Sequence, residues 1–265
     1  MKCNGLRFRG ALLASVSAAA LLGTALPVLA DDAAVAKKIE ERFEKARIST
    51  GGDVDVAVRN GAVTLTGGVA TVAAQREAEK LARKEAKFVE NRLVIVPEDR
   101  PDADIKKDVL SALRRNPHLG VFDSIEYGVD NGVVLLRGSV LRPYRKDEIE
   151  NTVTYIPGVR EVRDEIGVQG LSSFDESLRR QIYREVYGRL DSSLAGREGT
   201  NAPVRIVVDR GRVTLTGYVS SRVDQVLIGN IARGTLAFDV DNRIKVDGEP
   251  PTEDSKTGTG PSLVI

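Results

Sequence analysis

The sequence predicts an α/β fold of the α+β kind, built from three tandem copies of a small two-layer α-β-β-α-β unit. Three observations predict it: a ten-residue phrase occurs three times, an amphipathic helix precedes each copy, and a second helix and a strand follow. The phrase reads NGAVTLTGGV at 60–69, NGVVLLRGSV at 131–140 and RGRVTLTGYV at 210–219. The copies begin 71 and 79 residues apart, which is too long for a solenoid repeat and suits tandem small domains.

The first element of each unit is a helix with one apolar face. Apolar residues recur four positions apart before each phrase and charged residues fill the positions between them, which predicts one buried helical face. Asp102 and Asp175 stand where the second and third of these helices begin and are predicted to cap them. The apolar residues are Val35, Ile39 and Phe43; Ile105, Val109 and Leu113; and Leu178, Ile182, Val186 and Leu190.

The next two elements are the strands of a β-hairpin. Apolar and polar residues alternate on both sides of the turn, which predicts a sheet covered on one face. Asn60-Gly61 and Asn131-Gly132 suit a type I′ turn because both of its central residues need positive φ. Arg210 is a poorer first residue, so the third turn is expected to differ slightly. The apolar positions are Val54, Val56, Val58, Val63, Leu65 and Val69; Ile125, Tyr127, Val129, Val134, Leu136 and Val140; and Val204, Ile206, Val208, Val213, Leu215 and Val219.

A second glycine lies on the apolar face of each return strand, where a side chain is expected. It is predicted to leave room for a helix to lie close, or to mark a bulge. Because all these glycines stand in a strand-turn-strand setting, they do not form a dinucleotide fingerprint, and we interpret them as structural. They are Gly61, Gly132 and Gly211 in the turns and Gly67, Gly138 and Gly217 in the return strands.

The last two elements of each unit are a second amphipathic helix and a final strand. A crossover through this helix makes the final strand parallel to the return strand, so each unit is predicted to hold a three-stranded mixed sheet covered by two helices. The inward residues of the second helices are predicted to be Ala78, Leu81 and Ala82; Ile149, Val153 and Ile156; and Leu227, Ile231 and Ala232.

The first thirty residues resemble a secretory signal peptide. Lys2, Arg7 and Arg9 precede a short apolar run, and small residues end it before Asp31. We expect cleavage after Ala30 and export to the periplasm. An uncleaved membrane anchor is the alternative, and the shortness of the run and its interruption by a proline disfavour it. The expected organisation is a signal peptide at 1–30, domains at 31–98, 101–169 and 172–248, and a disordered tail at 249–265.

Composition excludes several classes of function. Without the three basic residues of the signal peptide, 36 Lys and Arg stand against 38 Asp and Glu, so no general attraction to nucleic acid is expected. The one cysteine lies in the signal peptide and the one histidine, His118, follows a proline in a loop, so neither disulfides nor a metal site are expected. No nucleophile or phosphate-binding motif is present. We expect no catalysis, no cofactor and no small-molecule substrate.

The repeated pattern resembles the BON domain (bacterial OsmY and nodulation) family. The resemblance rests on the phrase V-x-V-x-V-x-N-G-x-V-x-L-x-G-x-V and, after the second helix, on GVREVRDEIGV in the middle copy. It covers residues 32–248, although the outer copies have Lys87-Phe88-Val89 and Ala237-Phe238-Asp239 near the Gly158-Val159 step. It implies an α-β-β-α-β fold, an envelope location, interaction with phospholipid surfaces and a part in osmotic or envelope stress. It supplies no catalytic residues.

One helix stands out as a candidate binding surface. If Leu178, Ile182 and Val186 face inward, helical geometry places a group of arginines and tyrosines on the outward side, where they suit phosphate and the headgroup zone. A solvated charged face remains the alternative, because Glu176 and Glu185 offset the charge. We therefore hypothesise a non-enzymatic periplasmic protein that binds phospholipid surfaces under stress, or else a scaffold that binds envelope proteins or itself. The candidate residues are Arg179, Arg180, Tyr183, Arg184 and Tyr187.

Overall fold

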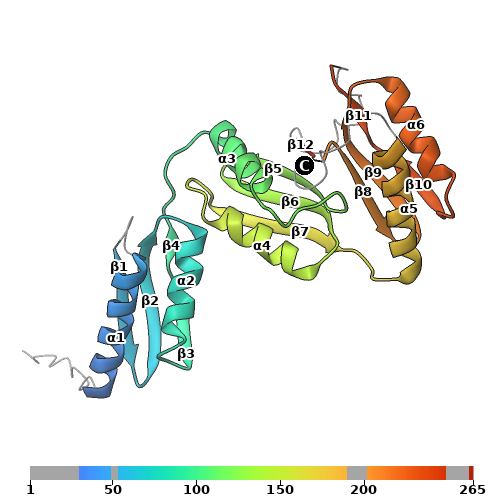
Figure 1. The fold of residues 1–265 in the computed structure, drawn as a ribbon. Coiled ribbons are helices and arrows are strands. Elements are labelled where there is room, and N and C mark those ends of the chain that lie inside the picture. The colour runs from blue at the N-terminus through green and yellow to red at the C-terminus, as the bar shows by residue number, and fades with distance from the viewer. Residues whose placement is uncertain (1–29, 49–52, 190–201, 249–262, 265) are drawn as a thin grey trace, which may run out of the picture.

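The structure is a computed structural model that describes residues 30–48, 53–189, 202–248 and 263–264. Three units of one design, here called domains 1, 2 and 3, follow one another in space as they do along the chain (Figure 1). The predicted signal peptide up to Leu29 lies outside the described residues, as do Leu190 and most of the predicted tail.

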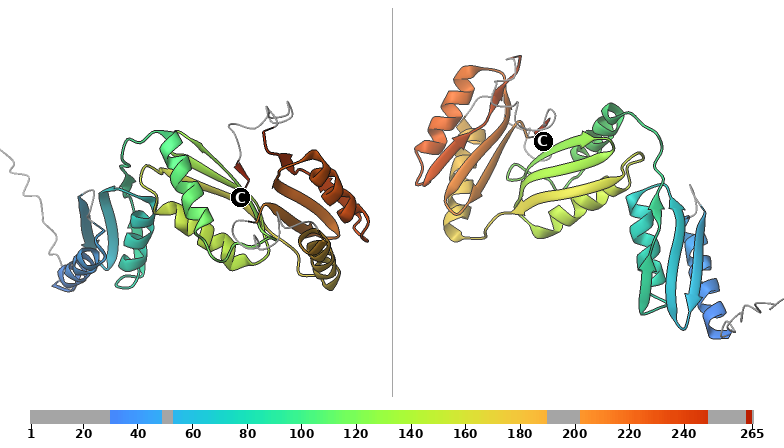
Figure 2. Two further views of the ribbon diagram at one scale, coloured as in Figure 1. Left: turned by 45° about the horizontal axis from the view of Figure 1, so that its top comes forward. Right: turned by 180° about the vertical axis from the view of Figure 1, so that it is seen from behind.

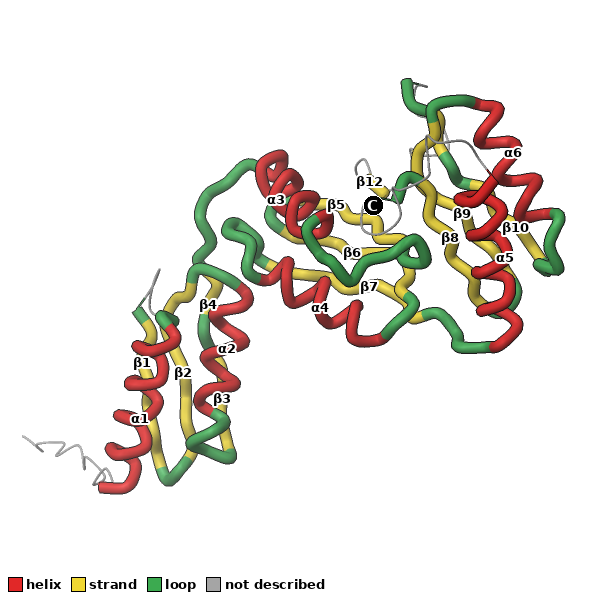
Figure 3. Tube along the Cα trace, in the orientation of Figure 1, coloured by secondary structure: helices red, strands yellow, loops and turns green. Residues whose placement is uncertain are grey.

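Each domain repeats the predicted order of helix, two strands, helix and final strand, with the helices in one layer and the strands in the other (Figure 3). Domain 1 consists of α1 (Ala30–Ala46), β1 (Val54–Arg59), β2 (Ala62–Val69), α2 (Val72–Ala82), β3 (Phe88–Asn91) and β4 (Val94–Ile95); domain 2 of α3 (Asp102–Arg114), β5 (Ser124–Asp130), β6 (Val133–Val140), α4 (Pro143–Thr154) and β7 (Glu161–Val168); and domain 3 of α5 (Ser173–Arg189), β8 (Val204–Asp209), β9 (Arg212–Val219), α6 (Arg222–Arg233), β10 (Asp239–Asn242) and β11 (Lys245–Val246). A further short strand, β12 (Leu263–Val264), follows.

The sheets are mixed, as predicted. In every domain the hairpin strands are antiparallel and the return strand pairs in parallel with the last strand. The expected three strands become four in domains 1 and 3, because the last strand is divided. Asn91 accepts from the Leu93 backbone N–H and donates to the Gln75 carbonyl of α2, so the backbone bends toward the helix between β3 and β4. The aspartate at the same place in domain 2, Asp164, has no amide to donate, and β7 is continuous.

The helical faces bury the predicted residues in domains 1 and 2, except that Val35 is only partly buried; Ile39, Leu113 and Ile149 are almost completely inaccessible. The prediction is wrong for Leu227 in domain 3, whose side chain is 43% exposed. The small residue Gly229 and Ala232 lie on the packed side of α6, so Ile228 takes the core position instead. The helix is thus turned by about one residue from the predicted orientation.

The three hairpin turns have one conformation. φ is +51° at Asn60 and +73° at Gly61, and +51° at Arg210 and +74° at Gly211. The expected difference in the third turn is therefore wrong. The reason lies outside the turn, in a carboxylate that binds its backbone.

An aspartate from the start of each domain's first helix accepts hydrogen bonds from both N–H groups of the turn; we call this the Asp clasp. The Asp102 carboxylate oxygens lie 2.8 Å from the Asn131 nitrogen and 2.9 Å from the Gly132 nitrogen. Asp32 and Asp175 do the same in domains 1 and 3. Successive N–H groups of a positive-φ pair converge and favour an anion. The predicted capping role of Asp102 and Asp175 is thus corrected: their carboxylates bind a distant turn, because it offers two N–H groups to one anion.

Asp102→Ala is expected to destabilise domain 2 by about 2 kcal/mol, since hydrogen bonds to a charged group contribute about 1.5–3 kcal/mol and this site is partly exposed. Hydrogen exchange of the β5 and β6 amides measures the change. Asp104→Ala is the matched control, because Asp104 begins the same helix but only pairs with exposed Lys107, and it is expected to cost less than about 0.5 kcal/mol. Equal effects of the two variants would contradict the clasp.

The glycine in each return strand faces a carbonyl oxygen of the strand before it, and no helix is its neighbour. φ is +117° at Gly138, and a Cβ there would lie 2.1 Å from the Ser124 carbonyl oxygen. The corresponding distances are 2.0 Å at both Gly67 and Gly217. The expectation that these glycines make room for a helix is therefore wrong, because the close neighbour is backbone of the adjacent strand.

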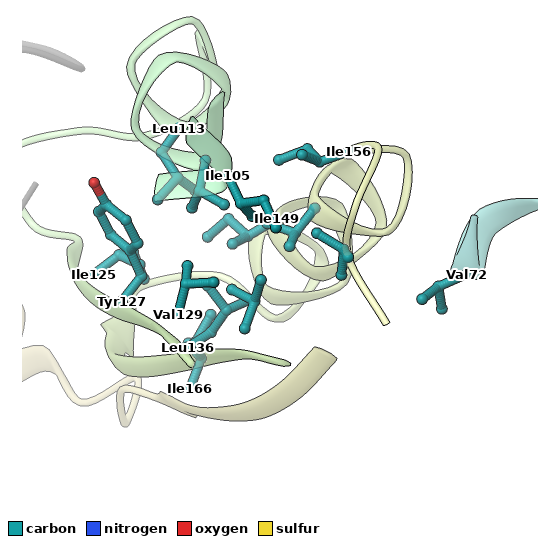
Figure 4. Close-up of a cluster of buried hydrophobic side chains, with 14 of the residues drawn as sticks. Val72, Ile105, Leu113, Ile125, Tyr127, Val129, Leu136, Ile149, Ile156 and Ile166 are labelled. Carbon is teal, nitrogen blue, oxygen red and sulfur yellow. The ribbon is translucent and has the colours of Figure 1, made fainter. Parts of the chain in front are cut away.

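Domain 1 meets domain 2 through its second helix. Val72 of α2 belongs to the cluster of buried side chains that forms the core of domain 2, and Figure 4 shows it beside the helix that carries Ile149. Arg76 of α2 also forms an ion pair of 2.7 Å with Glu150 of α4. The contact is small and lies along one side of each helix.

Domains 2 and 3 share a buried joint formed by the loop before β5. Val121 of this loop lies in the core of domain 3, and its carbonyl accepts from the Ile206 backbone N–H of β8 at 2.8 Å. Arg205, also buried, donates to the Gly120 carbonyl at 2.8 Å. The hydroxyls of Ser124 and Thr216 lie 2.8 Å apart. Backbone and side chains of both domains therefore fix this joint.

Candidate functional site

The structure separates the five predicted binding residues of α5. Arg180 and Arg184 are exposed, and Tyr183 is half-buried. Arg179 and Tyr187 are buried, with 1% and 5% of their surfaces exposed. Their predicted outward position is wrong.

The two buried residues serve the structure of domain 3. Arg179 donates to the carbonyls of Val208 and Gly170, at 2.5 and 3.2 Å, and so ties the linker before α5 to strand β8. The Tyr187 hydroxyl donates to the Val204 carbonyl at 2.5 Å.

The half-buried tyrosine connects the two domains. Tyr183 stacks on Tyr187 and contacts Phe122 of domain 2, with ring centroids 5.2 and 5.9 Å apart. The joint with domain 2 thus covers a second side of α5, which the pattern of one helix cannot reveal. Of the five predicted residues, only the two exposed arginines, Arg180 and Arg184, are accessible to a binding partner.

A surface that the sequence did not point to lies on the neighbouring helix, α6. Val223, Val226 and Leu227 of α6 point away from the core and are 73%, 49% and 43% exposed. Their spacing along α6 places them on one side of the helix, and we call them the α6 stripe. Isolated exposed apolar residues are ordinary, but several together on one helix face mark an interaction surface.

The α6 stripe is specific to domain 3. An equivalent hydrogen bond in each domain shows which residues of the second helices correspond. Gln75, Lys146 and Gln225 each donate from the side chain to a carbonyl of the last strand. In this alignment Val226 replaces Arg76 and Asp147. Leu227 likewise replaces Glu77 and Glu148. At these two positions domains 1 and 2 therefore carry charged residues where domain 3 carries apolar ones, whereas Val223 corresponds to Ala73 and Tyr144.

A second apolar feature lies where α6 leads to the last strand. Leu236 and Phe238 are each 77% exposed, and the Phe238 ring stacks on that of Phe174 at 5.3 Å between centroids. Phe238 also covers the turn at Gly211 and donates its backbone N–H to the Gly211 carbonyl at 2.8 Å. Apolar side chains are thus exposed along α6 and in the loop that follows it.

Arginines flank the α6 stripe. Arg222 and Arg233 occupy the two ends of α6 and are exposed, and Arg180 and Arg184 lie on the exposed side of α5. Helices α5 and α6 lie side by side over one face of the domain 3 sheet (Figures 1 and 2). An apolar stripe beside guanidinium groups suits a boundary between an apolar phase and phosphate.

Chemistry of other kinds finds little support in the part of the chain that the structure describes. There, no group of three His, Cys, Asp or Glu residues is arranged to hold a metal ion. His118 Nδ1 lies 2.8 Å from a carboxylate oxygen of Glu148, as an exposed pair. None of the described helices has the length and apolar character needed to cross a membrane.

Sequence reasoning missed the α6 stripe for an identifiable reason. Val223, Val226 and Leu227 adjoin Ile228, Ile231 and Ala232 on the helix, so apolar residues occupy most of its circumference. Such a helix offers no polar face to identify its outside. The signal available in the sequence was that domain 1 has charged residues, Arg76 and Glu77, where α6 has Val226 and Leu227.

The BON domain family matches the chain in three consecutive regions, residues 31–97, 101–170 and 180–248. Among solved structures, the C-terminal domain of CdsD, the structural protein of the Type III secretion system of Chlamydia trachomatis, is 13% identical, covering 79% of this chain and 96% of that one, with a TM-score of 0.25. A second CdsD structure is 12% identical over 83% and 93% of the two chains, with a TM-score of 0.24. No curated protein sequence matches significantly.

Proposed function

The chain belongs to the BON domain family over three consecutive regions, and from this premise we propose that it is a periplasmic protein that binds phospholipid membrane surfaces. BON domains are associated with membrane binding and with osmotic-stress proteins, and the family is non-enzymatic. Export rests on the signal-peptide pattern of residues 1–30. In this proposal the protein supports the integrity of the envelope under osmotic or other stress.

The observation that carries the proposal is the α6 stripe. Val223, Val226 and Leu227 enter the boundary between headgroups and acyl chains, where burying an apolar side chain contributes about 1.5–3 kcal/mol. The arginines at both ends of α6, with Arg180 and Arg184 of α5, face the lipid phosphates, where each cation contributes about 1 kcal/mol. Domain 3 is thus the membrane-facing domain, and domains 1 and 2 extend from it.

The double variant Val226→Arg, Leu227→Glu gives α6 the residues of α2 at these positions. We expect it to weaken co-sedimentation with anionic phospholipid vesicles about tenfold or more, because two apolar side chains no longer enter the lipid. Arg180→Glu, Arg184→Glu is expected to weaken binding at low salt and to have little effect at high salt. The measurement is the bound fraction against vesicle concentration at two or more salt concentrations, with zwitterionic vesicles in parallel.

Val94→Arg, Val96→Glu is the matched control, because both valines are exposed in domain 1, at 63% and 58%. It changes the same residue types and is expected to leave binding unchanged. If the natural chain fails to bind anionic vesicles even at low salt, the lipid proposal is wrong. In that case crosslinking in the native envelope tests the alternative, a scaffold for envelope proteins.

A further inference from the structure

The outer edge of β5 carries an added strand. Within the hairpin β5 pairs on one side with β6, and on its other side it pairs with β12 in antiparallel fashion. Leu263 lies opposite Tyr127 and Val264 opposite Glu126. Figure 1 shows β12 beside β5, between domains 2 and 3, and both views of Figure 2 agree. The edge of this sheet therefore accepts an extended segment distant in sequence.

The equivalent edge of domain 3 is also met by backbone from elsewhere, here by a turn at residues 120–123 of domain 2. There the Val121 carbonyl of domain 2 accepts from Ile206 of β8, and the Val121 side chain enters the core. Two of the three domains thus use the same edge, that of the first hairpin strand, to bind backbone from elsewhere. The edge of the unit is suited to strand addition.

Among the described residues, β12 pairs with two residues of β5, whereas β5 has seven. Backbone groups of an edge strand that point outward can bind a further strand. We propose that the outer edge of β5 is a strand-addition site for an extended segment of a partner protein, and that β12 is an intramolecular competitor for it. The proposal does not depend on lipid binding.

The side chains of β5 specify the kind of segment. Ile125, Tyr127 and Val129 are buried on the helical side of the sheet, and Glu126 and Asp130 lie on the other side. Residues opposite one another on adjacent strands lie on the same face. A fitting partner strand therefore alternates apolar residues with basic or small polar ones, and the basic residues face the acidic side of β5.

A partner protein fits this site better than a second copy of the chain. β12 belongs to the same chain as β5 and therefore competes intramolecularly, at an effective concentration that a free segment must exceed. The β12 strand of a second copy forms the same two residue pairs with β5. It therefore gains no hydrogen bonds that would offset the advantage of the attached β12. A segment that pairs with the whole of β5 makes more hydrogen bonds and can displace β12.

The test uses the full chain, its Leu263→Pro variant, and a fluorescent peptide, KVTLKVT, whose alternation matches β5 read in antiparallel order. Leu263 lies opposite Tyr127, whose backbone faces the outer edge, and proline at position 263 removes the N–H directed at β5. We expect the variant to bind the peptide about tenfold more tightly than the natural chain, because β12 no longer competes. We also expect hydrogen exchange at residues 124–130 to be faster in the variant than in the natural chain, and to slow when the peptide is added.

The control peptide, VLVKKTT, has the same composition without the alternation and is expected to bind neither chain. If KVTLKVT binds neither chain, or binds both equally, the proposal is overturned. It is also overturned if peptide binding leaves exchange at residues 124–130 unchanged. Light scattering identifies the remaining alternative: a dimeric natural chain and a monomeric Leu263→Pro variant would assign the site to a second copy.

Discussion

Replacing Gly138 by valine is expected to unfold domain 2 and to leave the sheet of domain 1 folded. The backbone at this glycine has φ of +117°, and a Cβ would lie 2.1 Å from the Ser124 carbonyl oxygen. Strain from the backbone and from overpacking together costs about 3–5 kcal/mol. A domain of this size has a stability near the lower end of about 5–15 kcal/mol. Hydrogen exchange with mass spectrometry separates β6 and β7 from the strands of domain 1.

Gly188→Ala is the control for this prediction. Gly188 lies in α5, and a Cβ there would have no neighbour within 4 Å. Alanine favours a helix over glycine by about 1 kcal/mol, so this variant is expected to be neutral or slightly stabilising. Retained protection of β6 in Gly138→Val would show that the strand can shift away from Ser124.

Asp123→Ala is expected to destabilise domain 2 and to loosen the joint with domain 3. The carboxylate is buried and accepts from the N–H groups of Gly120 and Leu141, both at 2.8 Å, and from the Arg145 guanidinium. Removing one partner of a buried ion pair leaves the other without compensation, at a cost of about 3–5 kcal/mol. The measurement is the rate of hydrogen exchange in the loop before β5 and in β8.

The same carboxylate acts on a second arginine across the joint. Burial lowers the pKa of Arg205, and the negative charge of Asp123 acts in the opposite direction. Asp123→Ala removes this favourable charge and thereby weakens the domain 3 side as well. Asp147→Ala, an exposed aspartate of α4 in the same domain, is the control and is expected to change neither segment. Loosening of β5 without any change in β8 would contradict the joint.

Much of the fold could be predicted because its signals are local. A period of four in Ile105, Val109 and Leu113 and a period of two in Val134 and Leu136 each reflect burial on one side of a single element. These periods, repeated three times, also predicted the element order. The division of β3 from β4 could not be predicted, because it depends on a bond between the Asn91 amide and the Gln75 carbonyl of another element.

The candidate site was predicted less well, because it too depends on contacts between different elements. A helix shows from its sequence which side is apolar, but not how many neighbours it has. Tyr187 and Arg179 were placed outside because only one covered side of α5 was assumed, whereas both side chains bind backbone of domain 3 itself, Tyr187 at Val204 and Arg179 at Val208. The α6 stripe was missed because its apolar residues merge with the core face. Only Arg180 and Arg184 combine the predicted position with observed exposure.

The Asp clasp has a consequence for the order in which each domain folds. It joins residues separated by only 28 to 36 positions, all within the first half of a domain. Asp32 can therefore bind its turn before α2 has packed on the sheet. Short-range closure of this kind is fast. Each hairpin can thus be held against the first helix of its domain before the second helix packs on it. This shortens the time in which it could pair with one of the other two hairpins, whose sequences are nearly the same.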